Sequence, residues 1–452
     1  MAGLLAGLAF PAESLANGRF PATVNARFQP GSDAMILLPT TFGLLISNDD
    51  GQSFRWVCED AIGYGGTFDP DYAIGANGRI YATTFEGLRY SDDSGCTWNT
   101  IGEPLANSWV GEVEVGGDNR VWAGTSTGGM PNDVYVSTDG VAFSSVGLLD
   151  DDTWFRSIRV APSDPDRVYV TGLVVATGGA DAGVTEPAPR LFVTADGGQN
   201  WNELATDAFE FGDQPDLFIE GVSPADPDIV FARVRGARQP VGDDLWRSAD
   251  GGANWEKVLS MGDTISAFTV RSDGQTVIAG SVNICQDEPP ESQKGCVRIS
   301  TDSGRTFSAP DYEPKMACID ERSDGTVFAC ASNWDPDQMA LGRLNANECW
   351  DKVVRFCEIA SPLECPAQTK QNECAALVWP SLAEQLGIGQ CADNVDGERC
   401  APVFTPDAGP AAADAGQGGG GGCGCSSSPR PASTLALLLF ALLPWLRRKP
   451  QH

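Results

Sequence analysis

Histidine is almost absent from this chain of 452 residues, because the one copy is His452 at the end of the sequence. Ser-His-Asp and Cys-His catalysis both need a histidine beside the nucleophile, so both are excluded. Zinc sites usually need His or paired CxxC spacings, and neither occurs here. Disulfides in an oxidising compartment are therefore the better account of the 14 cysteines.

Basic residues are also scarce, with 30 Lys and Arg against 61 Asp and Glu and a formal charge of −31. Phosphate binding needs clustered Lys and Arg, so we expect no nucleic-acid partner. The acidic surface is more simply explained as a solubility device. The 52 Gly and 12 Trp, placed between short apolar runs, are typical of an all-β protein.

Long apolar runs are missing as well. Thr434 to Leu446 is apolar and is followed by Arg447-Arg448-Lys449, but it is short of the roughly 20 residues that a spanning helix needs. At the other end, apolar Ala2 to Phe10 precedes Ser14-Leu15-Ala16, which a signal peptidase could cut. We expect a signal peptide at residues 1–16. Because it lacks a basic region, the true start is expected upstream of Met1.

An eight-residue motif recurs along the chain. Clear copies are SNDDGQSF, SDDSGCTW, TADGGQNW, SADGGANW and STDSGRTF, and Ser137 to Phe143 is one residue short. A degenerate seventh copy is expected at Leu344 to Trp350, with Asn347 as its marker. The other motif aspartates are 44 to 57 residues apart, close to the repeat length of propeller blades.

The chemistry of the motif is structural. Its Asp accepts hydrogen bonds from backbone N–H groups of its own turn, its Gly adopts a conformation that a Cβ would penalise, and its final aromatic residue packs under the turn. We assign this role to Asp49, Gly51, Asp93, Gly95, Asp139, Asp196, Gly198, Asp250, Gly252, Asp302 and Gly304.

The motif resembles the Asp-box, or bacterial neuraminidase repeat, of sialidases, some glycoside hydrolases, sortilin-like receptors and a photosystem assembly factor. The resemblance covers roughly residues 20–357 and implies a β-propeller, with the boxes between the third and fourth strands on the face away from the ligand. It is unspecific for function. Sialidases also carry an Arg-Ile-Pro motif, an Arg triad and a Tyr–Glu pair. Only Arg19-Phe20-Pro21 and Tyr312-Glu313 distantly resemble these features, so we do not expect sialidase activity.

We predict an all-β, seven-bladed propeller of four-stranded antiparallel blades, followed by a Cys-rich C-terminal extension. In the first blade the expected strands are Ala22–Phe28, Ala34–Leu38, Gly43–Ser47 and Phe54–Val57; in the fourth they are Trp154–Val160, Arg167–Gly172, Leu191–Thr194 and Trp201–Leu204. The expected divisions are 1–16, propeller 17–357, Cys-rich extension 358–400, Pro/Ala/Gly linker 401–422 and tail 423–452.

Cysteine positions suggest two disulfides. Cys285 and Cys296 flank a polar loop, and Cys318 and Cys330 lie on two arms of a hairpin. Six more cysteines, from Cys349 to Cys400, allow 15 pairings and stay unassigned.

The tail has Cys423-Gly424-Cys425, an apolar run and a basic end. This order resembles the C-terminal sorting tails of myxobacterial surface proteins, in which a Cys marks processing and anchoring. The resemblance gives that role to Cys423 or Cys425 and places the protein outside the cytoplasm, at the cell surface or outer membrane. A plain membrane anchor is the alternative.

Function is expected on the face opposite the motifs, where the long loops 60–69, 173–189, 205–216, 235–243 and 282–294 fall. Two hypotheses stay open. The first is a non-catalytic module, expected to be a monomer without cofactor, that binds a protein or polysaccharide. The second is a glycoside hydrolase that uses a pair of acids, which could instead hold Ca²⁺. The candidate acids are Asp69, Asp71, Glu112, Asp151, Asp152, Glu210, Asp213 and Glu220.

Overall fold

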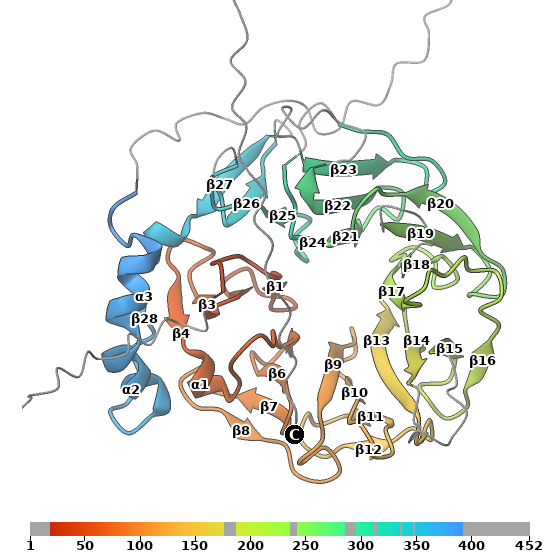
Figure 1. The fold of residues 1–452 in the computed structure, drawn as a ribbon, viewed down its shortest axis with the longest axis horizontal. Helices are drawn as coiled ribbons and strands as arrows, with labels where there is room; N and C mark the ends of the chain where they lie inside the picture. The colour runs from red at the N-terminus through yellow and green to blue at the C-terminus, as the bar shows by residue number, and fades with distance from the viewer. Residues whose placement is uncertain are drawn as a thin grey trace, which may run out of the picture. The chain divides into compact units, whose positions relative to one another are not determined.

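Seven sheets surround a central axis in the computed structural model, and consecutive strands within each are antiparallel, so the chain is a seven-bladed β-propeller, as the repeats predict (Figure 1). The structure describes residues 19–175, 187–235, 242–284, 295–310, 314–334, 337–346 and 349–391. All of them belong to one compact unit.

The first four blades each run from an inner to an outer strand in chain order. Blade one has β1 (Arg27–Phe28), β2 (Ile36–Thr40), β3 (Gly43–Ser47) and β4 (Arg55–Val57). Blade two has β5 (Tyr72–Ile74), β6 (Ile80–Thr84), β7 (Gly87–Ser91) and β8 (Asn99–Thr100). Blade three has β9 (Val110–Val115), β10 (Val121–Thr125), β11 (Val134–Ser137) and β12 (Ser144–Ser145). Blade four has β13 (Thr153–Ala161), β14 (Asp164–Val174), β15 (Ala188–Thr194) and β16 (Asn202–Leu204).

The last three blades complete the ring. Blade five has β17 (Leu217–Val222), β18 (Val230–Arg235), β19 (Asp243–Ser248) and β20 (Glu256–Ser260). Blade six has β21 (Ala267–Val270), β22 (Val277–Ile284) and β23 (Gly295–Ser300), with an isolated bridge between Ile299 and Ser308 where an outer strand would lie. Blade seven has β24 (Cys318–Glu321), β25 (Val327–Cys330), β26 (Leu341–Leu344) and β27 (Trp350–Val354).

The second strands of the blades are buried on both sides, as in β2, β6 and β10, where every residue is buried. A blade packs face to face against both neighbours, so its middle strands have no solvent-facing side. This explains the continuous apolar runs of these strands, such as Ile36-Leu37-Leu38.

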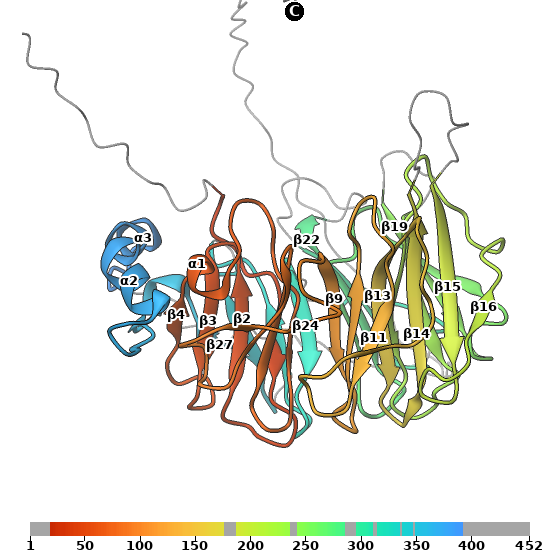
Figure 2. The ribbon, with the colours of Figure 1, turned by 90° about the horizontal axis from the view of Figure 1, so that it is seen from below.

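The antiparallel order defines two faces of the ring. Turns between first and second strands, and between third and fourth strands, lie on one face, which we call the lower face. Loops between second and third strands, and the crossings from one blade to the next, lie on the other, which we call the upper face. Figure 2 views the same strands from the side.

Six turns between third and fourth strands share one hydrogen-bond pattern on the lower face. In blade six, Asp302 Oδ1 accepts a hydrogen bond from the Thr306 N–H at 2.9 Å. Ser300 Oγ accepts from the Gly304 N–H at 2.9 Å, and Gly304 has φ of 75°. The hydroxyl of the first Ser or Thr in each motif thus helps to hold the turn, as the Asp carboxylate does. The same pair of contacts recurs around Asp49, Asp93, Asp196 and Asp250, and a shorter version around Asp139.

The turn of blade seven is shifted relative to the sequence expectation. The Cys349 N–H donates to Asn345 Oδ1 at 3.1 Å, four residues back, as Thr306 does to Asp302. Asn345 therefore takes the position in this turn that was expected for Asn347, which lies outside the described residues.

The extension after blade seven packs onto blade one. β28 (Ser361–Pro362) pairs in parallel with β4 and makes blade one five-stranded. The short 3-10 helix η2 (Phe356–Glu358) precedes it, and α2 (Lys370–Leu377) and α3 (Trp379–Leu386) follow at the rim of the ring, beside β4 and near α1 (Glu59–Ile62) (Figures 1 and 2).

Three disulfides between described residues hold this extension. Cys58 bonds Cys374, and Cys96 bonds Cys365, so residues of α2 and of the segment before it are tied to blades one and two. A third bond joins Cys357 to Cys391. The pairing across more than 260 residues explains why local sequence could not assign it.

Elsewhere, Cys318 and Cys330 form a disulfide between directly paired residues of β24 and β25. Cys296 is also disulfide-bonded, but Cys285 lies outside the described residues, so that pairing stays a prediction. Cys423, Cys425 and the apolar run after them also lie outside the described residues, so the predicted tail stays a prediction. Among the described residues, no helix is long and apolar enough to cross a membrane.

Candidate binding face and central channel

The inner strands enclose a channel whose upper end is a cavity of about 210 Å³. Asp69 and Asp71 reach it from the crossing into β5, and Glu112 from β9, so three of the sequence-predicted acids come together here. Arg27 and Arg159 line the same cavity.

Arginines pair with each of these acids. Asp69 pairs with Arg19 at 2.7 Å, and Arg27 Nη2 lies 3.1 Å from Asp71 Oδ1. Arg159 Nη1 lies 2.6 Å from Glu112 Oε1. Arg27 and Arg159 were not among the sequence-predicted site residues, because they come from other blades and lie 44 and 47 residues from their acids along the chain. These contacts give Asp69 and Asp71 a structural role, since an arginine holds each of them at the channel.

Glu112 is the most perturbed acid of this group. Burial, and then the charge of Asp71, raise its pKa from 4.5 to about 8, against the opposing effect of Arg159. A carboxyl that keeps its proton near neutral pH can act as a general acid, and perturbed groups in cavities are candidates for function.

A larger cavity of about 370 Å³ occupies the channel below, lined by residues of all seven inner strands and their ends. Its charged residues are Arg27, Glu114, Arg159, Glu220 and Asp320. Glu220 Oε1 accepts from Arg233 Nε at 2.5 Å. Burial raises the pKa of both Glu114 and Asp320. This part of the channel is therefore lined by charged side chains, of which Glu220 is bound to Arg233.

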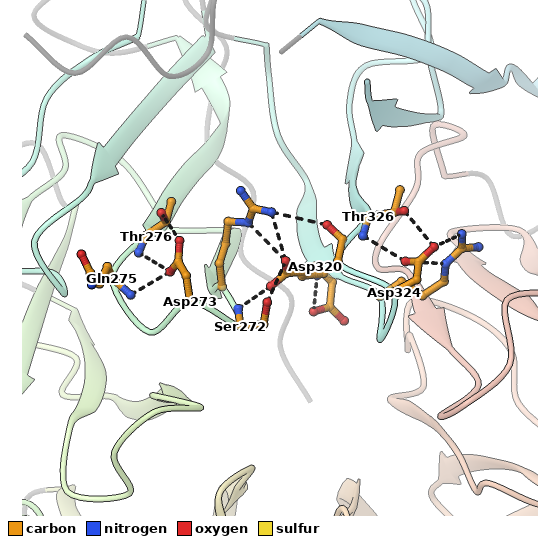
Figure 3. A network of polar contacts seen from close by, with 11 residues as sticks. Ser272, Asp273, Gln275, Thr276, Asp320, Asp324 and Thr326 are labelled. Carbon is orange, nitrogen blue, oxygen red and sulfur yellow. Dashed lines mark hydrogen bonds and ion pairs between the residues drawn. The ribbon is translucent and has the colours of Figure 1, made fainter. Parts of the chain in front are cut away.

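Asp320 belongs to a network of polar contacts on the lower face, shown in Figure 3. Its neighbour Glu321 accepts from Arg271 Nη2 at 3.1 Å and from the Ser272 N–H at 2.5 Å, which links blades six and seven. Asp273 and Asp324 accept hydrogen bonds within their own turns (Figure 3). The lower-face acids are thus engaged in holding turns and adjacent blades.

The other candidate acids lie apart from the channel. Asp151, Asp152, Glu210 and Asp213 line neither cavity, and Glu210 pairs with Lys257 at the surface. The described residues contain no group of three or more His, Cys, Asp or Glu placed to hold a metal ion. Of the sialidase-like positions, Arg19 is bound to Asp69, while Tyr312 and Glu313 lie outside the described residues.

Exposed apolar side chains are distributed unequally between the two faces. Of nine large ones among the described residues, six lie on the upper face: Phe20, Phe85, Met130, Leu149, Val282 and Trp334. The lower face has Val141, and the extension has Leu377 and Val378. Grouped exposed apolar residues mark interaction sites more often than scattered ones do.

A row of aromatic rings crosses the upper face from blade two to blade four. Ring centroids of Phe68 and Phe85 lie 4.5 Å apart, those of Phe85 and Trp109 5.2 Å, and those of Trp109 and Trp154 5.6 Å. Phe85 is 54% exposed. Nothing in the sequence marks this row, because its members come from three blades and share no motif.

Two of the long upper loops, 60–69 and 205–216, are described throughout. The other three include residues 176–186, 236–241 and 285–294, which lie outside the described residues.

No family model and no curated protein matches this chain. Among solved structures, a GH74 xyloglucanase from Xanthomonas campestris is similar, with 13% identity, a TM-score of 0.36 and coverage of 74% of this chain and 73% of that one. YCF48 bound to D1 peptide is 15% identical, with a TM-score of 0.44 and coverage of 68% and 90%. The Dos1 propeller is 9% identical, with a TM-score of 0.42 and coverage of 72% and 91%. Because each of these TM-scores lies below 0.5, function must be inferred from this chain's own residues.

Proposed function

We propose that this protein is an exported, surface-anchored β-propeller that acts as a non-catalytic binding module, with the upper face as its binding face. One observation carries the proposal: the upper face holds six of the nine exposed large apolar side chains among the described residues. Rigid scaffolds commonly bind through such loop faces. The six lower-face turns, which we propose to be of the Asp-box type, serve the scaffold.

Arginine pairing of the upper-channel acids supports a non-catalytic role. A hydrolytic pair needs one carboxyl that protonates the leaving group and one that acts as base or nucleophile. Here Asp69 and Asp71 are each bound to an arginine, as is Glu112. An arginine bound to a carboxyl group occupies the place beside it that a substrate oxygen would need.

A glycoside hydrolase is the second candidate, and Glu112 is the observation that favours it. Its pKa is raised, which suits a general acid, and Asp71 lines the same cavity as a second carboxyl. Such an enzyme requires two carboxyl groups in one site.

Activity of the full chain against a panel of soluble polysaccharides separates the two candidates. We expect no release of reducing ends from any of them. Turnover that is lost in both Glu112→Gln and Asp71→Asn would overturn the binding proposal and establish the hydrolase. Asp213→Asn, at an exposed acid outside both cavities, is the matched control.

Surface anchoring has its own test. The double variant Cys423→Ser/Cys425→Ser should release the protein from the cell surface into the medium, and the single variant that does the same identifies the processed Cys. Retention of the double variant on the surface would instead favour a plain membrane anchor.

A further inference from the structure

The aromatic row of the upper face extends into a larger apolar surface. A Cβ at Gly128 would lie 3.5 Å from Trp154 Cζ2, so the loop that carries Met130 passes beside Trp154. Backbone hydrogen bonds of 2.9 Å between Asn132 and Asp150, in both directions, bring Leu149 to the same loop. We call this surface the apolar patch; it consists of Phe68, Phe85, Trp109, Met130, Leu149 and Trp154.

The composition of the patch matches the core of a protein interface. Aromatic residues and Met are enriched in such cores, whereas charged residues are depleted. Phe85, Met130 and Leu149 are 54%, 51% and 65% exposed, so much of their apolar surface is in contact with water. Covering it would give the main gain of binding.

Ring orientation argues against a sugar platform. The planes of Phe68 and Phe85, and those of Phe85 and Trp109, are tilted by 46°, and those of Trp109 and Trp154 by 73°. A row of sugar rings would stack best on parallel faces. Tilted rings together with the side chains of Met130 and Leu149 make an uneven surface that suits apolar protein side chains better.

The charged residues around the apolar patch indicate which charge its partner carries. Exposed Glu86 follows Phe85 directly, and exposed Asp151 lies two residues after Leu149. The nearby Arg190 is already paired with Asp150 and Glu203. The whole chain carries −31, so both the rim and the long-range field favour a basic partner.

We infer that the apolar patch binds a basic protein segment whose Phe- or Leu-type side chains are inserted among its rings, while Lys or Arg side chains face the acidic rim. Cations can also lie over the aromatic faces. This inference rests on the binding function proposed above and specifies its partner.

Binding of synthetic peptides to the full chain tests the inference. The probe is a peptide of about eight residues with alternating Lys and Phe, which is roughly 25 Å long when extended. Three comparison probes are alternating Glu and Phe, alternating Lys and Ser, and cellohexaose. We expect the Lys–Phe peptide to bind more tightly than all three, with an affinity that falls as salt rises.

Two substitutions locate the site. Phe85→Ser should weaken Lys–Phe binding at least about fivefold, as truncation of an interface anchor does. Val141→Ser removes an apolar side chain that is 44% exposed on the lower face, and it should leave the affinity unchanged. Circular dichroism spectra of both variants should match the parent, because both side chains are largely exposed.

The other outcomes separate failure of this inference from failure of the binding function. If cellohexaose binds and Phe85→Ser abolishes it, the face binds a polysaccharide and the basic-segment inference is overturned. Equal binding of the Glu–Phe peptide would overturn the charge argument, and hence the inference. If no probe binds, or if Val141→Ser weakens binding as much as Phe85→Ser, the assignment to the patch is wrong.

Discussion

Removal of the Cys58–Cys374 disulfide should destabilise the propeller substantially. The bond spans 316 residues of sequence, but Cys96–Cys365 already joins the same two regions, with a separation of 269. The extra loop that Cys58–Cys374 closes is therefore about 50 residues long, and chain entropy assigns it ~4 kcal/mol. Replaced disulfides commonly cost about 2 to 5 kcal/mol.

The native contacts around this bond reinforce the expectation. Gln371 is fully buried, its Oε1 accepts from the Cys58 N–H at 2.8 Å, and its Nε2 donates to the Trp56 carbonyl at 2.7 Å. The rings of Trp56 and Trp379 lie 5.5 Å apart. These contacts depend on α2 and α3 staying against β4, which the disulfide enforces.

The assay is equilibrium unfolding in guanidinium chloride of the Cys58→Ala/Cys374→Ala variant. Cys318→Ala/Cys330→Ala is the matched control, because all four cysteines are buried and the control bond has a sequence separation of 12. We expect a loss of about 2 to 4 kcal/mol in the first variant and a loss smaller by about 1 kcal/mol in the control. A loss below about 1 kcal/mol in the first variant would refute the view that the extension is part of the folded ring.

Two further predictions concern single residues. The raised pKa of Glu112 means that the unfolded chain ionises above pH 4.5 while the native carboxyl stays protonated up to about 8, so stability falls as pH rises through this window. Glu112→Gln should remove up to about 1.4 kcal/mol per pH unit of this slope in thermal unfolding scans, and an unchanged slope would contradict the assignment. Gly95 has φ of 98°, and a Cβ there would lie 2.8 Å from Ile46 Cδ1, so Gly95→Ala should lower the free energy of unfolding by about 1 to 3 kcal/mol. The control is Gly102→Ala, because a Cβ there has no heavy atom within 4 Å. It should change the free energy of unfolding by less than about 0.5 kcal/mol. Equal losses of stability in the two variants would contradict the steric argument for Gly95.

Local features of the fold were predictable because their physics is local. The fourth blade was expected to begin with Trp154–Val160, and β13 covers Thr153–Ala161. In the first blade the expected strand Gly43–Ser47 is β3 itself. Alternating apolar residues and Gly-containing turns encode these strands within a few residues of sequence, so no distant partner is needed to find them.

Long-range features were not predictable for the opposite reason. β28 pairs with β4 through Ser361 and Arg55, and nothing in the sequence of either strand specifies the other. The pairing of Arg159 with Glu112 likewise depends on the closure of the ring. The apolar patch could not be predicted because Phe85 and Trp154 carry no distinguishing motif. Only the packing of three blades places their rings in one row.

A photo-cross-linking comparison tests the central claim, that the upper face is the binding face, most directly. A benzophenone amino acid is placed at Phe85 in one variant and at Val141 in another, both at exposed positions, and each variant is irradiated in a culture of the cells that produce it. The account predicts covalent adducts of defined mass from position 85 and none from position 141. Adducts from position 141 alone, or equal adducts from both, would contradict it.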